Sequence, residues 1–144
     1  MKPSKPPGKA IRILLADDHP VVREGMVSIL KAKDIKVIGE ASDGEEACKL
    51  YDELSPDILI LDLRMPKKDG LQVVAELMSR IPKPWIIVMT TYEGEEDVRR
   101  ALSAGAKGYV LKGTKRDQIL ETVRKVYQGQ PSLCRMLPRN SPIL

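Results

Sequence analysis

The sequence predicts an α/β protein built on a parallel sheet of five strands, with five helices flanking the sheet. Five short apolar runs alternate with five segments that show helical spacing or helix-start signals. Several runs are apolar at successive positions, which is typical of strands buried on both faces of a parallel sheet. A chain of 144 residues, 42% of them hydrophobic, is long enough for one such domain and its core.

The first two strand–helix units are predicted in the amino-terminal part of the chain. The run "IRILLA" at 11–16 is the first strand, and Pro20 suits the first turn of the helix that follows. The apolar face of that helix comprises Val22, Met26, Ile29 and Leu30. The run "KVIGEA" at 36–41 is the second strand, and Ser42 or Asp43 caps the helix after it.

Three further units complete the predicted alternation. Strands three to five are expected at 57–63, 84–91 and 108–112, and helices three and four at 70–80 and 94–104. The 94–104 helix has few apolar positions, which fits an element of low local stability. The last helix begins near Thr114, which resembles a capping box with Asp117. Its apolar face comprises Ile119, Leu120, Val123, Val126 and Tyr127.

The positive charge of the chain is concentrated at its ends. Of the 24 lysines and arginines, three lie in 1–10 and two in 131–144, where there are no acidic residues. Residues 11–130 therefore hold 19 basic and 20 acidic residues, so the basic pI is poor support for nucleic-acid binding. Two cysteines and one histidine are too few for a disulfide framework or a zinc site. We expect no membrane span and a cytoplasmic location.

Polar side chains follow four of the five predicted strands. Asp17 and Asp18 end the first strand, Asp62 the third, Thr90 the fourth and Lys112 the fifth. Because the carboxyl ends of parallel strands share one edge, where open α/β sheets bind ligands, we expect these side chains to meet. Each alone has an ordinary explanation, such as helix capping for the two adjacent aspartates. The complete set, ordered on the right strands, favours a functional site.

The chemistry of this set points to a phosphoryl group. Three carboxylates in one pocket repel one another unless a cation joins them. Oxygen ligands without histidine or cysteine suit Mg²⁺, which takes one or two protein carboxylates plus a phosphate. A lysine adds a fixed positive charge, and a threonine hydroxyl can donate to a phosphate oxygen. The set therefore predicts a carboxylate that accepts a phosphoryl group beside Mg²⁺ and a lysine.

Four segments together resemble the receiver domain of bacterial two-component response regulators: "LLADDHPVVREGM", "PDILILDLRMPKKDGL", "IIVMTTYEGEEDV" and "ALSAGAKGYVLKG". Two of their parts, "ADDHPVVREG" and "AGAKGYVLK", are most similar to the LuxR-type (NarL/FixJ) regulators. The resemblance implies a flavodoxin-like fold with strand order 2-1-3-4-5 and a receiver domain at 10–130. We expect a disordered basic segment at 1–9 and a linker stub or flexible tail at 131–144, without the helix-turn-helix domain of LuxR-type regulators.

The resemblance also implies a role for each residue of the site. It makes Asp62 the phospho-acceptor and Lys112 the contact to the phosphoryl group. The Mg²⁺ ligands are then Asp17, Asp18 and Asp62, with the backbone carbonyl of Arg64.

Two further residues are implied to form a switch. Thr90, rather than its neighbour Thr91, provides the switch hydroxyl, and Tyr109 is the aromatic residue that rotates inward after Thr90 moves. Gly113 departs from the family, which usually has proline or, in this subgroup, aspartate at that position. The conformation of the 112–113 peptide therefore stays open.

The implied function is that of a phospho-accepting signalling domain rather than an enzyme. A sensor histidine kinase phosphorylates Asp62, and the domain switches a surface that controls a transcriptional output domain outside this chain. DNA is reached only through that output domain. Catalysis is limited to autocatalytic phosphoryl transfer and slow self-dephosphorylation. Alternatives left open are a stand-alone receiver acting as phosphorelay or adaptor module, and a homodimer formed on phosphorylation.

Other classes of protein have less support from the sequence. A Mg²⁺-dependent phosphatase that forms an aspartyl phosphate would have an acid two residues after Asp62, where this chain has Arg64. A nucleotide- or flavin-binding protein would carry a glycine-rich loop after the first strand. A degenerate receiver would not need the intact Asp, Thr and Lys set. His19 is more simply interpreted as a solvated side chain than as a catalytic one.

Overall fold

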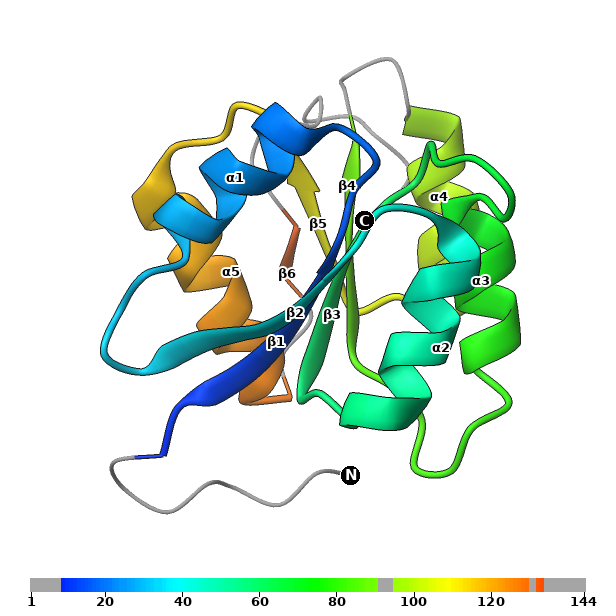
Figure 1. Ribbon diagram of the computed structural model, residues 1–144, viewed down its shortest axis with the longest axis horizontal. Coiled ribbons are helices and arrows are strands. Elements are labelled where there is room, and N and C mark those ends of the chain that lie inside the picture. Colours follow the sequence, from blue (N-terminus) through cyan, green and yellow to red (C-terminus); the bar gives the residue numbers. More distant parts are fainter. Residues whose placement is uncertain (1–8, 91–94, 130–131, 134–144) are drawn as a thin grey trace.

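Strands and helices alternate along the chain in the computed structural model, which describes residues 9–90, 95–129 and 132–133 (Figure 1). The five predicted strands are β1 (Ile11–Ala16), β2 (Ile35–Ala41), β3 (Ile58–Asp62), β4 (Ile86–Thr90) and β5 (Gly108–Leu111). The helices are α1 (Pro20–Ile29), α2 (Gly44–Leu54), α3 (Gly70–Leu77), α4 (Glu95–Ala104) and α5 (Arg116–Tyr127). In the described part of the chain, no helix is long and apolar enough to cross a membrane.

The sheet has the predicted order and one additional strand. The order β2-β1-β3-β4-β5 is confirmed, and every pair of neighbours is parallel. A short strand, β6 (Ser132–Leu133), pairs in parallel with β5 at Gly108 and Tyr109. Ser132 and Leu133, within the predicted tail at 131–144, thus lie against the edge of the sheet, and two residues are too few to give a strand pattern in the sequence. Residues 1–8 and the rest of 131–144 lie outside the described residues.

Different helices cover the two faces of the sheet (Figure 1). Ile13 and Leu15 of β1 belong to the core cluster under α1 and α5. Leu14 and Ala16 belong to the other cluster, under α2, α3 and α4. All four are fully buried, because alternate residues of a strand point to opposite faces of a sheet. Burial on both faces explains why this strand appears in the sequence as a continuous apolar run.

Side-chain caps were predicted for two of the helices, α2 and α5, and the structure has such a cap on α2 alone of these two. Asp43, rather than Ser42, is the N-cap of α2, and its carboxylate accepts a hydrogen bond from the third residue of the helix. The predicted capping box between Thr114 and Asp117 is wrong. The N-cap residue of α5 is Lys115, which makes no side-chain capping hydrogen bond, and the Thr114 hydroxyl donates to the backbone carbonyl of Leu111, 2.6 Å away.

Candidate functional site

The predicted site residues lie together at the carboxyl edge of the sheet. Asp17 directly follows β1, Asp62 and Thr90 are the last residues of β3 and β4, and Lys112 directly follows β5. Because β3 lies between β1 and β4, the strand order brings these ends side by side. Asp17, Asp62 and Thr90 are each at most 1% exposed. The sheet therefore holds two carboxylates and a hydroxyl inside its rim.

Lys112 links the acids of two neighbouring strands. Its Nζ atom lies 2.9 Å from Oδ2 of Asp62 and 3.5 Å from Oδ2 of Asp17. The backbone N–H of Arg64 donates to the other oxygen of Asp62, Oδ1, at 3.1 Å. The Asp62 carboxylate is thus held by a cation on one oxygen and a backbone donor on the other.

Burial and hydrogen bonding have opposite effects on this pair. Burial raises the pKa of the Asp62 carboxyl, although the hydrogen bonds from Lys112 and the Arg64 N–H oppose the rise. Burial also acts to lower the pKa of Lys112, but its contacts with Asp62 and Asp17 outweigh that effect and raise it. Lys112 therefore remains a cation at neutral pH.

The acids at the rim have the features of a cation site. Carboxylate oxygens of Asp17, Asp18 and Asp62 and a ring nitrogen of His19 lie within 4.8 Å of one another. Among the described residues, Asp17 Oδ2 and Asp18 Oδ1 are buried and accept no hydrogen bond, although Lys112 Nζ lies 3.5 Å from the first and His19 Nδ1 lies 3.0 Å from the second. Buried carboxylate oxygens that accept no hydrogen bond are costly, and a cation between them would offset that cost. These residues therefore fit the predicted Mg²⁺, a hard cation that prefers oxygen ligands.

His19, which the sequence suggested was only solvated, contacts both acids. Its Nδ1 atom lies 3.2 Å from Asp17 Oδ1 and 3.0 Å from Asp18 Oδ1, and its backbone N–H donates to Asp17 Oδ1 at 2.8 Å. The side chain is 60% exposed, so it covers the solvent side of the acids. Its place directly after the two aspartates was the only signal for this contact in the sequence.

Thr90 and Tyr109 are both buried near the rim. Within the described residues, the Thr90 hydroxyl oxygen has no hydrogen-bond partner. Tyr109 on β5 is 1% exposed and belongs to the core cluster under α2, α3 and α4. The structure thus shows the inward position of Tyr109, whereas the predicted switch starts from a ring that has yet to turn inward. Thr91 lies outside the described residues.

Gly113 adopts a backbone conformation that favours glycine. Its φ is +90°, and a Cβ atom there would meet nothing within 4 Å, so the backbone angle and not crowding selects the residue. Ile81–Pro82 is the one cis peptide among the described residues. The peptide between Lys112 and Gly113 is therefore trans.

A family model described as "Response regulator receiver domain" matches residues 13–124. This chain belongs to the response-regulator receiver family. The receiver is 42% identical over 124 residues to the transcriptional regulatory protein LiaR of Bacillus subtilis, covering 85% of this chain and 59% of LiaR. It is 38% identical to the nitrate/nitrite response regulator protein NarL of Escherichia coli, covering 92% of this chain and 60% of NarL. The receiver thus spans about three-fifths of the length of these relatives.

Solved structures confirm the fold and the LuxR-type relationship. A LuxR-family two-component response regulator from Aurantimonas superposes with a TM-score of 0.80 at 31% identity, over 85% of this receiver and 89% of that chain. The receiver domain of the putative regulator NarL from Mycobacterium tuberculosis gives a TM-score of 0.79 at 35% identity, over 85% and 99% of the two chains. The flavodoxin-like receiver fold is therefore shown for this protein.

Proposed function

We propose that Asp62 accepts a phosphoryl group from a phosphohistidine on a sensor histidine kinase. The supporting observation is the position of Asp62, which pairs with the ammonium of Lys112 and lies beside two acids whose buried oxygens Asp17 Oδ2 and Asp18 Oδ1 accept no hydrogen bond. One side of this carboxylate is neutralised by the protein, and the other side fits a metal. Phosphoryl transfer depends mainly on placement and charge neutralisation, and this arrangement provides both.

The transfer exchanges one bond to phosphorus for another. An oxygen of Asp62 forms the new P–O bond while the P–N bond to the kinase imidazole breaks, and the imidazole leaves with the electron pair and takes up a proton. Lys112 neutralises charge on the phosphoryl oxygens. Asp17, Asp18, Asp62 and the backbone carbonyl of Arg64 would hold Mg²⁺, which would supply further charge neutralisation. The catalysis that we propose is limited to phosphorylation of this protein's own Asp62 and to slow loss of that phosphoryl group.

Phosphorylation then changes the balance between two states of the receiver. The buried Thr90 hydroxyl gains an acceptor when phosphoryl oxygens are added at the rim. Its movement stabilises the inward position of Tyr109, and the surface formed by α4, β5 and α5 changes with it. The result is a population shift that a partner can detect.

We further infer that this receiver is cytoplasmic and controls a transcriptional output domain, through which alone it would reach DNA. Relatives such as LiaR are named as transcriptional regulatory proteins and are longer than this chain. A stand-alone phosphorelay or adaptor role is the alternative. Of the three residues on candidate dimer faces, Met26 and Val123 are buried in the core and Val22 packs against it. These three residues therefore give a homodimer no support.

Labelling with a small-molecule phosphodonor and Mg²⁺ tests the acceptor. Wild-type protein should be labelled, Asp62→Asn should not, and Asp52→Asn, at an exposed site on α2, should behave as wild type. Equal labelling of Asp62→Asn would show that the acceptor is another residue. Turnover of an unrelated phosphomonoester would instead favour a phosphatase.

A further inference from the structure

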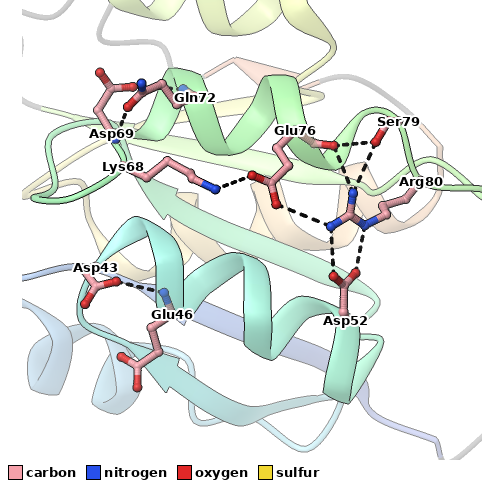
Figure 2. A network of polar contacts seen from close by, with 9 residues as sticks. All are labelled: Asp43, Glu46, Asp52, Lys68, Asp69, Gln72, Glu76, Ser79 and Arg80. Atoms are coloured by element: carbon pink, nitrogen blue, oxygen red, sulfur yellow. Dashed lines mark hydrogen bonds and ion pairs between the residues drawn. The ribbon is translucent and has the colours of Figure 1, made fainter.

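The turn after Asp62, residues 63–69, is fastened to the two helices beside it. Lys67 Nζ lies 3.5 Å from Asp43 Oδ2, at the start of α2. The ammonium of Lys68 forms an ion pair with the carboxylate of Glu76 on α3 (Figure 2). Asp69 forms a capping box with Gln72 in the first turn of α3. The turn also contains Arg64, whose carbonyl is the proposed fourth Mg²⁺ ligand.

The backbone of this turn is tightly folded. Lys67 has a φ of +67°, a left-handed conformation that is unfavourable for a residue with a Cβ atom. The N–H of Lys68 donates to the carbonyl of Pro66 at 2.7 Å, and the N–H of Gly70 donates to the carbonyl of Leu63 at 3.0 Å. These bonds close the segment onto the end of β3. A change in the position of Lys68 is therefore transmitted along a short, constrained backbone.

Glu76 is the centre of the contacts that hold Lys68. Figure 2 shows its carboxylate between Lys68 and Arg80, and Arg80 Nη2 lies 3.5 Å from Glu76 Oε2. Arg80 in turn donates two hydrogen bonds of 2.9 Å to Asp52 on α2. The hydrogen bond from Lys68 lowers the pKa of Glu76, so Glu76 is ionised at neutral pH. Burial, with the charge of Glu76, raises the pKa of the nearby Cys48 thiol to about 11, so the thiol remains neutral.

We propose that Lys68, held by Glu76, is a positioning residue for the Mg²⁺ site. The ion pair fixes the turn so that the Arg64 carbonyl is placed for metal binding before the ion arrives. Lys68 acts through the backbone of the turn and not as a ligand. This inference rests on the proposed Mg²⁺ site and adds residues outside that site which set its affinity.

The charge of Lys68 and its role as an anchor predict opposite changes in Mg²⁺ affinity when Lys68 is replaced. A lysine ammonium repels a cation, so removal of Lys68 would strengthen Mg²⁺ binding or leave it unchanged if charge alone mattered. Removal of an anchor has the reverse effect, because a loosened turn must be ordered when the metal binds. Loss of a residue that supports metal ligands typically weakens affinity by about 10- to 100-fold. The direction of the change therefore separates positioning from charge.

The test is a calorimetric Mg²⁺ titration of the full chain at fixed ionic strength. We expect Lys68→Met and Glu76→Gln each to weaken binding about tenfold, and the double variant to be no weaker than either single variant. Lys68→Arg should bind within about twofold of wild type, because it keeps the ion pair. Unchanged or tighter binding by Lys68→Met would overturn the proposal. A wild-type chain that binds no Mg²⁺ would instead count against the proposed function.

Two control variants distinguish an effect of the turn on Mg²⁺ affinity from general effects of charge and of helix packing. Lys49→Met removes one positive charge from an exposed position on α2, and Asp52→Asn breaks the contact with Arg80 at a distance from the turn. Both should bind Mg²⁺ like wild type. Equal weakening by Asp52→Asn would assign the effect to helix packing and overturn the role of Lys68. Without Mg²⁺, amides of residues 63–69 should exchange hydrogen faster in Lys68→Met than in Asp52→Asn, and equal exchange would contradict the proposed anchor.

Discussion

The ammonium of Lys112 contacts two buried carboxylates from neighbouring strands, at 2.9 Å from Asp62 Oδ2 and 3.5 Å from Asp17 Oδ2. Buried charges persist in folded proteins when they are paired. Lys112 therefore compensates the two acids, and we propose for it the second function of supplying positive charge where a phosphoryl group would be added. Each function can be tested separately.

Replacing Lys112 by methionine should slow phosphorylation of Asp62. Loss of one preorganised charge-stabilising group typically costs about 10²–10³ in rate, so we expect a decrease of about 10²-fold. The initial rate of labelling by a small-molecule phosphodonor with Mg²⁺ measures it. Lys107→Met, at an exposed position before β5, is the matched control and should be labelled at the wild-type rate. A wild-type rate for Lys112→Met would show that Lys112 does not act on the phosphoryl group.

Asp62→Asn should be more stable than wild type at neutral pH. Burial raises the folded-state pKa of Asp62 above its ordinary value of 3.8. Between pH 3.8 and this raised pKa, the folded protein therefore binds more protons than the unfolded chain. The free energy of unfolding of the wild-type protein therefore falls as the pH rises from 3.8 to the raised pKa, and it stays lower at higher pH. Asparagine has no charge to bury, so the advantage of Asp62→Asn should shrink as the pH falls toward 3.8. Urea unfolding midpoints of both proteins across this range measure the difference, and a pH-independent difference would contradict the raised pKa.

Thr90→Val should stabilise the unphosphorylated protein while removing the switch. The Thr90 hydroxyl is buried without a hydrogen-bond partner in the described part of the chain, and burying such a group costs about 1–3 kcal/mol. Valine has nearly the same shape, so we expect a gain of about 1 kcal/mol in the free energy of unfolding. Thr122→Val is the control, because the Thr122 hydroxyl donates to the carbonyl of Gln118 at 2.9 Å. Thr122→Val should give no such gain, and equal gains would show that the missing partner of Thr90 is not the cause.

The layout of the site was predictable because it follows from the strand pattern. Asp17, Asp62, Thr90 and Lys112 each stand at the end of an apolar run, and a parallel sheet brings those ends to one edge. Their types then limit the chemistry to a cation and a phosphoryl group. Fold and site were predictable together because four of the five runs that specify the fold also end in the residues of the site.

Contacts that depend on side-chain direction or on helix packing were not predictable. The ring of His19 contacts both acids, but sequence position alone does not fix the orientation of an exposed ring. Arg80 reaches Asp52 on α2 because α2 and α3 pack side by side, and the eight-residue spacing of Lys68 and Glu76 matches no local pattern. The Thr114 hydroxyl was predicted to accept a hydrogen bond at the start of the last helix, but the structure shows it donating to the carbonyl of Leu111, which the sequence pattern did not indicate.

Two helical glycines should respond to alanine in opposite directions. A Cβ atom at Gly44, the first residue of α2, would lie 1.8 Å from the carbonyl oxygen of Lys68, which is backbone and cannot move aside alone. Gly44→Ala should therefore destabilise the protein by about 1–3 kcal/mol, as overpacking does. At Gly25, on the exposed side of α1, a Cβ atom would meet nothing within 4 Å. Gly25→Ala should stabilise it by about 0.5–1 kcal/mol, because glycine inside a helix costs backbone entropy.

Urea unfolding of both glycine variants measures these changes as shifts of the midpoint at constant slope. Since the Gly44 contact is with the turn after Asp62, Gly44→Ala should also displace that turn and weaken Mg²⁺ binding, whereas Gly25→Ala should leave binding unchanged. A stable Gly44→Ala variant with wild-type Mg²⁺ affinity would mean that close contact between α2 and this turn does not set the affinity of the site.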